Sequence, residues 1–130
     1  MSIKAILSIK PKYAERILRG EKSYEYRKRI FRSEDVSRVV MYATQPVSQL
    51  VGEFGVKKIH RDDPDRLWDR TSDAAGLTWA QFNSYFQDRS TGVAIEISRV
   101  ERFSPPVDPW DKIEDFHPPQ SFCYWKSSVG

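Results

Sequence analysis

Short segments with the apolar pattern of β-strands recur along most of the chain, and they constrain its fold more than any other feature. Strands are predicted for residues 3–9, 23–29, 38–44, 49–59, 92–103 and 120–125. The third predicted strand, residues 38–44 (RVVMYAT), is apolar on both faces, so we expect it to lie in the centre of a sheet.

Irregularities are expected inside two of these strands. Gly52 and Gly55 lie within the fourth predicted strand and mark bulges or points where another segment of backbone approaches closely. In the fifth, Val100 is out of phase with the apolar residues before it, which predicts a bulge near Ser98.

Helices are few and short. They are predicted for residues 11–19, for residues 62–70 and for the segment that follows Thr78. Thr78 and Gln81 have the spacing of a capping box, in which each side chain bonds the backbone N–H of the other residue. Residues 104–119 contain five of the eight prolines and are expected to form a long irregular connection.

Together these elements predict an α+β fold, a small β-barrel of five to six strands whose openings are covered by two to three short helices. A doubly wound sheet is not expected, since the chain lacks a regular β-α-β alternation and a glycine-rich phosphate loop. The length suits a single domain spanning residues 1–130, with its core at about 3–125 and a tail at 126–130.

The composition argues against several kinds of site. Cys123 is the single cysteine, so neither an internal disulfide nor a cysteine-based zinc site is expected. His60 and His117 are far apart and form no zinc-binding motif, so we predict no metal and no cofactor. No stretch has the length of a membrane span, and Lys4 interrupts the apolar start, which predicts a cytoplasmic protein without a membrane partner.

Positive charge is concentrated in the first quarter of the chain. Residues 1–32 contain ten Lys or Arg and three acidic residues, a net charge of +7, whereas residues 33–130 contain 11 basic and 15 acidic residues, a net charge of −4. Such a one-sided field attracts phosphate-bearing partners, which favours nucleic acid. A solvated basic face without a partner would show the same clustering.

The eight residues GEKSYEYR (20–27) place charged side chains at the start of a predicted strand. Successive strand residues point to opposite faces, so Glu25 and Arg27 share one face, and the long side chain of Lys22 can reach over the start of the strand. A carboxylate beside an arginine can hold the guanidinium in one orientation and leave donors for a phosphate or a planar acceptor. An ordinary surface ion pair after a helix end would have the same spacing.

The pattern Gly20-x-Lys22-x-x-Glu25-x-Arg27 resembles the G-x-K-x-x-E-x-R signature of ASCH domains, which belong to the PUA-like superfamily. The surrounding segments are similar to the same family over nearly the whole chain. They are LSIKPKYAERILRGEKSYEYRKR, VVMYATQPVSQLVGEFGV, GVAIEISRVERF and PPQSFCYW.

This resemblance implies a PUA-like barrel with a cleft between the signature segment and the covering helices. It also implies that the cleft binds RNA or a modified nucleotide through Gly20, Lys22, Glu25 and Arg27. Some ASCH-like proteins are enzymes: one branch deacetylates acetylated cytidine, and another is reported as a metal-dependent ribonuclease. The deacetylase branch carries a threonine three residues after its lysine, where this chain has Glu25.

Four further residues are candidates for contacts with a nucleotide. Ser8 and Lys10 end the first predicted strand close to the expected cleft, although an ordinary strand end followed by a helix start would place them there too. Gln120 and Ser121 can read a base edge beside the aromatic residues that follow them.

Carboxylates lie inside two predicted strands. Glu53 and Glu96 would each suit a general base or a metal ligand if the barrel enclosed them. Outward-facing strand residues are the commoner case for glutamate. Asp62, Asp63 and Asp65 instead have the spacing of helix caps.

Three functions remain open at this point. The first is an RNA- or nucleotide-binding module, in which Lys22 and Arg27 supply positive charge and Glu25 orients Arg27 or accepts a base amino group. The second is a hydrolase, either an amidohydrolase of modified nucleosides or a ribonuclease, in which Lys22 activates water or polarises a carbonyl and Glu25 transfers protons. The third is a protein-interaction domain.

Overall fold

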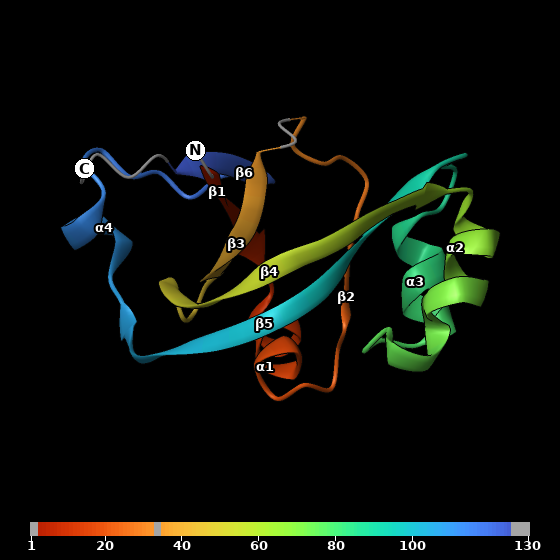
Figure 1. The fold of residues 1–130 in the computed structure, drawn as a ribbon, viewed down its shortest axis with the longest axis horizontal. Helices are drawn as coiled ribbons and strands as arrows, with labels where there is room; N and C mark the ends of the chain where they lie inside the picture. Colours follow the sequence, from red (N-terminus) through yellow and green to blue (C-terminus); the bar gives the residue numbers. More distant parts are fainter. Residues whose placement is uncertain (1–2, 33–34, 126–130) are drawn as a thin grey trace.

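The computed structural model describes residues 3–32 and 35–125, and these residues form six strands, four α-helices and one 3-10 helix (Figure 1). The strands are β1 (Ile3–Ile9), β2 (Tyr24–Arg27), β3 (Val36–Ala43), β4 (Gln49–Asp62), β5 (Gly92–Val107) and β6 (Phe122–Trp125). The helices are α1 (Pro11–Leu18), α2 (Pro64–Thr71), the 3-10 helix η1 (Ser72–Ala74), α3 (Trp79–Tyr85) and α4 (Pro109–Lys112). Within the described ranges, no helix is long and apolar enough to cross a membrane. The predicted tail at 126–130 lies outside them.

The six strands form one curved sheet in the order β2-β5-β4-β3-β1-β6. β1 and β3 are parallel, and the other neighbouring pairs are antiparallel. β4 and β5 run side by side across the molecule as the two longest strands in Figure 1. The edge strands β2 and β6 meet through side-chain hydrogen bonds, because Arg27 of β2 donates to Ser121 immediately before β6. The predicted barrel-like α+β fold is therefore confirmed, with a sheet whose backbone ladder does not close.

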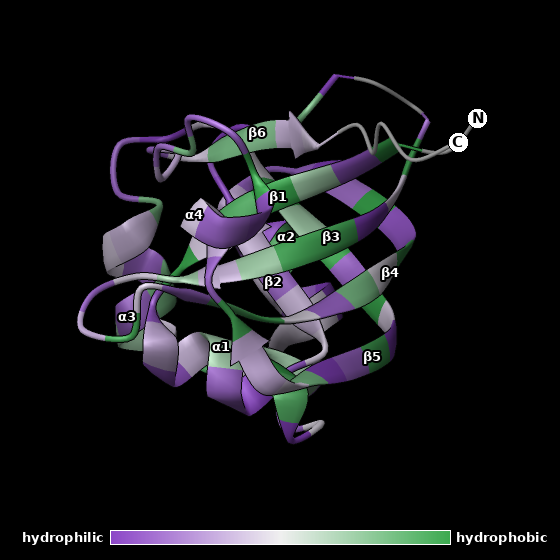
Figure 2. Ribbon diagram, turned by 90° about the vertical axis from the view of Figure 1, so that its left-hand side faces the viewer, coloured by the Kyte–Doolittle hydropathy of each residue, from purple (hydrophilic) through white to green (hydrophobic). Residues whose placement is uncertain are grey.

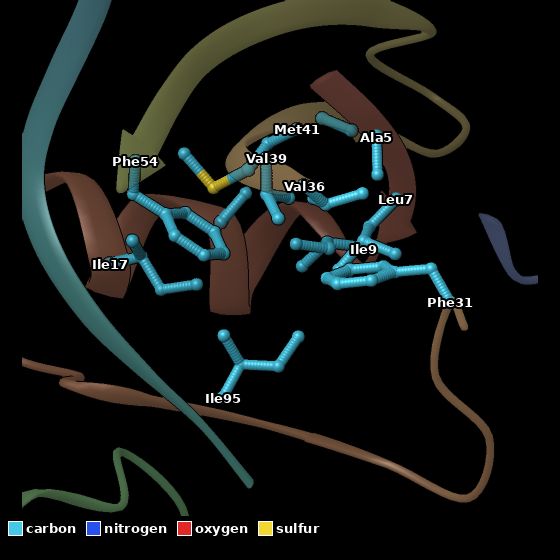
Figure 3. Packing of buried hydrophobic residues seen from close by; sticks show 12 residues of the cluster. Ala5, Leu7, Ile9, Ile17, Phe31, Val36, Val39, Met41, Phe54 and Ile95 are labelled. Atoms are coloured by element: carbon cyan, nitrogen blue, oxygen red, sulfur yellow. The ribbon is translucent and has the colours of Figure 1, made fainter. Parts of the chain in front are cut away.

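The centre of the sheet is buried on both faces, as predicted for β3. Alternate side chains of β1 and β3, such as Leu7 and Met41, pack into the main core with Phe54 and the inner face of α1 (Figure 3). The side chains that point the other way, such as Tyr42, pack in a second cluster with Phe116. Figure 2 shows both strands as largely hydrophobic, which is the composition that two-sided burial requires.

The expected irregularities in β4 and β5 are confirmed. The pairing of the two strands shifts register between Glu53 and Gly55, and Ser98 lies opposite the second of these residues. A Cβ atom on Gly52 would lie 2.5 Å from the backbone oxygen of Glu101 and 2.7 Å from a side-chain carbon of α1. Glycine at position 52 therefore lets the backbone of β5 and the helix approach β4 closely.

β5 is longer than predicted and includes part of the segment expected to be irregular. Pro105 and Pro106 belong to β5, and α4 follows directly after it. Proline is tolerated at this point for two reasons. The β4–β5 pairing shifts from Gly52 opposite Arg102 to Leu50 opposite Val107, so Pro105 and Pro106 have no paired residue in β4. On the other side, β2 pairs only with Val93–Glu96. The expectation of an irregular segment is wrong for residues 104–112, and α4 raises the number of helices above the two to three predicted.

The helix starts agree with the sequence. The Gln81 N–H donates to the Thr78 hydroxyl at 3.2 Å, and the Thr78 N–H donates to the Gln81 side chain at 2.9 Å, which completes the predicted capping box of α3. The Asp63 carboxylate accepts the N–H of Arg66 at 3.0 Å, so Asp63 caps α2. Figure 1 shows α2 and α3 packed together at the end of the molecule opposite α4.

Gly52→Ala is expected to lower the free energy of unfolding by about 3 kcal/mol, because the added methyl group overlaps the backbone of β5. Gly20→Ala is the matched comparison. Gly20 has a φ of +78°, but nothing lies within 4 Å of an added Cβ, so the backbone strain alone is expected to cost about 1 kcal/mol. Urea denaturation of both variants measures the difference. Equal losses would contradict the close approach at Gly52.

Candidate functional site

A cleft of about 670 Å³ lies between α1, β2 and α3. Figure 2 shows α1 and α3 on the same side of the molecule. Of the eight residues singled out from the sequence, Gly20 and Ser121 do not line the cleft. The six that do are Ser8, Lys10, Lys22, Glu25, Arg27 and Gln120.

Lys22 lines the cleft although it is 2% exposed. Its ammonium donates a hydrogen bond to the backbone oxygen of Ala75 at 2.7 Å and lies 4.7 Å from the centroid of the Tyr26 ring. Burial lowers the pKa of Lys22 to about 8, although the nearby Glu25 carboxylate acts in the opposite direction. A lysine with this pKa is partly neutral near physiological pH and can take up a proton from a ligand.

The turn after α1 positions this lysine. Gly20 follows the helix in the left-handed conformation, with a φ of +78°, and the N–H groups of Glu21 and Lys22 both donate to the backbone oxygen of Arg16. From the other side, Gly76 has a φ of +71°, and a Cβ there would lie 2.5 Å from the Cβ and Cγ atoms of Lys22. Glycine at 76 therefore lets the segment after η1 pack directly on the lysine stem.

The guanidinium of Arg27 forms hydrogen bonds within the protein. Its Nη1 donates to the backbone oxygen of Ser8 at 3.1 Å and to the Glu25 carboxylate at 3.3 Å. Its Nη2 donates to the backbone and side-chain oxygens of Ser121 at 3.0 and 2.8 Å. Glu25 thus orients Arg27 as expected, but the donors expected to face a phosphate contact β1 and the segment before β6. Arg27 is a link between strands that forms one wall of the cleft.

The remaining predicted residues lie at the rim. The Ser8 hydroxyl donates to the backbone oxygen of Pro119 at 2.6 Å, so Ser8 can offer a ligand an acceptor rather than its proton. Lys10 is exposed and immediately precedes α1, and Gln120 is exposed on the opposite segment. The side chains of Lys10 and Gln120 can therefore both reach a ligand in the cleft.

Sequence reasoning missed the part of the cleft that α3 and the tyrosines form. Gln81, Ser84 and Tyr85 line it from one side of α3, and Tyr13 and Tyr26 line it from α1 and β2. The capping box located α3, but the face that a helix turns toward β2 depends on tertiary packing. The available signal was the tyrosine content of the signature segment itself, although the Tyr26 ring is 5% exposed and contacts the Lys22 ammonium rather than offering a stacking surface.

The strand carboxylates lie outside the cleft and are paired. Glu53 is 6% exposed and accepts hydrogen bonds from Lys4 and Arg38. Burial acts to raise the pKa of Glu53, but these bonds hold it below its ordinary value. Glu96 bonds His60 at 2.9 Å. Among the residues the structure describes, no group of three or more His, Cys, Asp or Glu side chains could hold a metal ion, so the cleft does not fit the ligand set of a metal site.

Arg27→Ala is expected to lower the free energy of unfolding by about 3 kcal/mol, because it breaks the link between strands and leaves the 7% exposed Glu25 without its salt-bridge partner. Ser121→Ala removes one acceptor of the same guanidinium and is expected to cost about 1 kcal/mol. Chemical denaturation compares the two. If the Arg27 variant is as stable as the Ser121 variant, the link contributes little to the fold.

Comparisons with known proteins identify the family. Residues 3–114 match a family model described as a domain of unknown function, DUF365. Over 122 residues the chain is 30% identical to the ASCH domain-containing ribonuclease of Zymomonas mobilis, and the match covers 92% of this chain and 82% of the relative. The chain belongs to the ASCH domain family. The similarity of this ASCH domain to the family therefore extends from the signature segment over most of the chain.

Solved structures share the fold. ASCH from Zymomonas mobilis superposes with a TM-score of 0.87 at 28% identity, covering 95% of this ASCH domain and 87% of that chain. A tyrosine-to-phenylalanine mutant of ZmASCH has a TM-score of 0.87 at 26% identity, covering 95% and 90% of the two chains. The barrel-like architecture expected from the signature is thus the one that solved ASCH proteins adopt.

Proposed function

We propose that this ASCH domain binds RNA in the cleft and cleaves the RNA backbone there. The proposal is carried by Lys22, a buried lysine that lines the cleft and whose pKa is lowered to about 8. The Zymomonas mobilis relative is named a ribonuclease, which supports RNA as the substrate class. The net charge of +7 in residues 1–32 supports a phosphate-bearing ligand.

Binding would use the rim of the cleft. Lys10 and Lys12 are exposed cleft residues that form no ion pair with any acid in the described part of the chain. Exposed ammonium groups position RNA through its phosphates without reading its sequence. Tyr85 is 38% exposed, so its ring offers a stacking surface, and the Gln120 amide offers donors and acceptors for a base edge.

Cleavage would use the 2′-hydroxyl of the RNA as the nucleophile. The neutral amine of Lys22 accepts the 2′-hydroxyl proton, the 2′-oxygen bonds to the adjacent phosphorus, and the bond from phosphorus to the 5′-oxygen breaks. The departing 5′-oxygen takes a proton from water, so the products carry a 2′,3′-cyclic phosphate and a 5′-hydroxyl. Lys10 and Lys12 stabilise the negative charge that builds on the phosphate.

The protonation of Lys22 limits this reaction. Glu25 and the Tyr26 ring favour the ammonium form, and burial opposes both more strongly. With a pKa of about 8, roughly a tenth of the Lys22 side chains are neutral at pH 7 and about half at pH 8. The neutral form is the base, so the rate follows its population.

The single-turnover rate of RNA cleavage is therefore expected to rise about tenfold per pH unit well below pH 8 and to level off above it. A fluorescent oligoribonucleotide with saturating protein gives this rate directly. A rate that does not change between pH 6 and pH 9 would rule out Lys22 as the base.

Lys22→Met removes the amine and keeps an apolar stem, and it is expected to slow cleavage at pH 8 by at least about a hundredfold while RNA still binds. Lys58→Met is the matched control, because Lys58 is an exposed lysine outside the cleft. Mass spectrometry of the product ends checks for the cyclic phosphate. Wild-type protein that binds RNA and leaves it intact would instead be a binding module, and full activity in the Lys22 variant would refute the proposed role.

A further inference from the structure

A second hollow, of about 1200 Å³, begins where β2 ends. We call it the basic groove, and its cations are Lys28, Arg29, Arg32 and Arg61. All four residues are exposed. They come from the segment after β2 and from the far end of β4, so the fold brings together positive charge from two separate parts of the chain.

Among the described residues, the two acidic side chains that line the groove, Asp62 and Asp63, do not cancel this charge. Asp62 accepts a hydrogen bond from Arg70 at 3.1 Å, and Asp63 caps α2, so both carboxylates of the groove already have partners outside it. The guanidinium groups of Arg29 and Arg61 form no hydrogen bond or ion pair with any residue that the structure describes. They are available to an anionic ligand.

Aromatic side chains line the same groove. Phe122 and Tyr124 lie on one face of β6 with their ring centroids 5.7 Å apart, and Tyr124 is 41% exposed. Exposed rings beside cationic side chains are the combination that binds single-stranded nucleic acid, because bases stack on the rings while the cations contact the phosphates.

The basic groove adjoins the cleft at two places. The ammonium of Lys28, in the groove, lies 4.8 Å from the ring centroid of Tyr85, in the cleft, and the Lys28 N–H donates to the Tyr85 hydroxyl at 3.2 Å. Along the segment that enters β6, Gln120 lines the cleft and Phe122 lines the groove. An RNA strand that leaves the cleft past Tyr85 would therefore enter the basic groove next.

We propose that the basic groove binds the part of a single-stranded RNA that flanks the nucleotides in the cleft. Its phosphates contact Arg29 and Arg61, and one of its bases stacks on Tyr124. The inference rests on the proposed function, because it extends the same RNA beyond the cleft. Single-strand-binding folds commonly cover about 4–16 nucleotides. A ten-nucleotide strand would thus occupy both sites, and a dinucleotide would occupy the cleft alone.

Fluorescence anisotropy with uridine oligomers of two and ten nucleotides tests this. The oligomers carry 2′-fluoro groups in place of the 2′-hydroxyls, so they cannot be cleaved by the proposed reaction. The double variant Arg29→Gln/Arg61→Gln is expected to bind the ten-nucleotide oligomer at least about tenfold more weakly and the dinucleotide as wild type does. The slope of log affinity against log salt is expected to decrease in magnitude by about 1.4, since each single-strand phosphate contact contributes about 0.7.

The double variant Arg99→Gln/Lys112→Gln is the control, because it removes the same charge from exposed residues that line neither site. It is expected to bind both oligomers like wild type. Equal losses in the two double variants, or wild-type protein that binds ten nucleotides no more tightly than two, would overturn the groove while dinucleotide binding still supported the cleft. Wild-type protein that binds neither oligomer would overturn the proposed function and the groove with it.

Discussion

The guanidinium of Arg27 joins parts of the sheet that no backbone ladder joins, and the cleft depends on this link. A sheet with the order β2-β5-β4-β3-β1-β6 has edges at β2 and β6. Arg27, at the end of β2, donates to Ser8 near the end of β1 and to Ser121 before β6, so its guanidinium bridges the two edges of the curved sheet. Because Glu25 accepts from the same guanidinium, one side chain both bridges the edges of the sheet and orients the acidic residue of the cleft.

The burial of Lys22 in the cleft sets the pKa on which the proposed reaction depends. Burying an ammonium group is unfavourable, and the Ala75 carbonyl and the faces of Tyr13 and Tyr26 compensate in part. The folded pKa of about 8 lies below the ordinary value of 10.5. Between these values the unfolded chain binds more protons than the folded chain, so the contribution of Lys22 to stability rises as pH rises through this window. The proposed base is thus a group that the fold keeps partly neutral at a cost in stability near neutral pH.

Local signals predicted those parts of the fold that local physics decides. The capping box at Thr78, the glycine at 52 and the two-sided burial of β3 each depend on neighbouring residues or on strand period, and each was correct. Residues 104–112 were misread because proline is excluded from paired positions of a strand but tolerated where the pairing is interrupted, and the register of β4 against β5 shifts at this point. The sequence carries no local sign of that shift.

The candidate site, too, was predicted in part from the sequence, and the rest depends on contacts between distant residues. The signature located Lys22 and Glu25 in the cleft, but the partners that hold Arg27 lie as far as 94 residues away and could not be read from spacing. The contribution of α3 through Gln81 and Tyr85 depends on which face of the helix meets β2. Pairwise distances across the fold, rather than residue types, therefore decide which charged groups remain available to a ligand.

The protonation of Lys22 decides whether the cleft can accept a proton from RNA near neutral pH. NMR titration of protein labelled at the lysine Cε and Nζ atoms measures this pKa, and the signal that disappears in Lys22→Met assigns it. We predict a titration midpoint near 8 for Lys22. A midpoint near 10.5, the ordinary value for lysine, would contradict a buried amine that acts as a base.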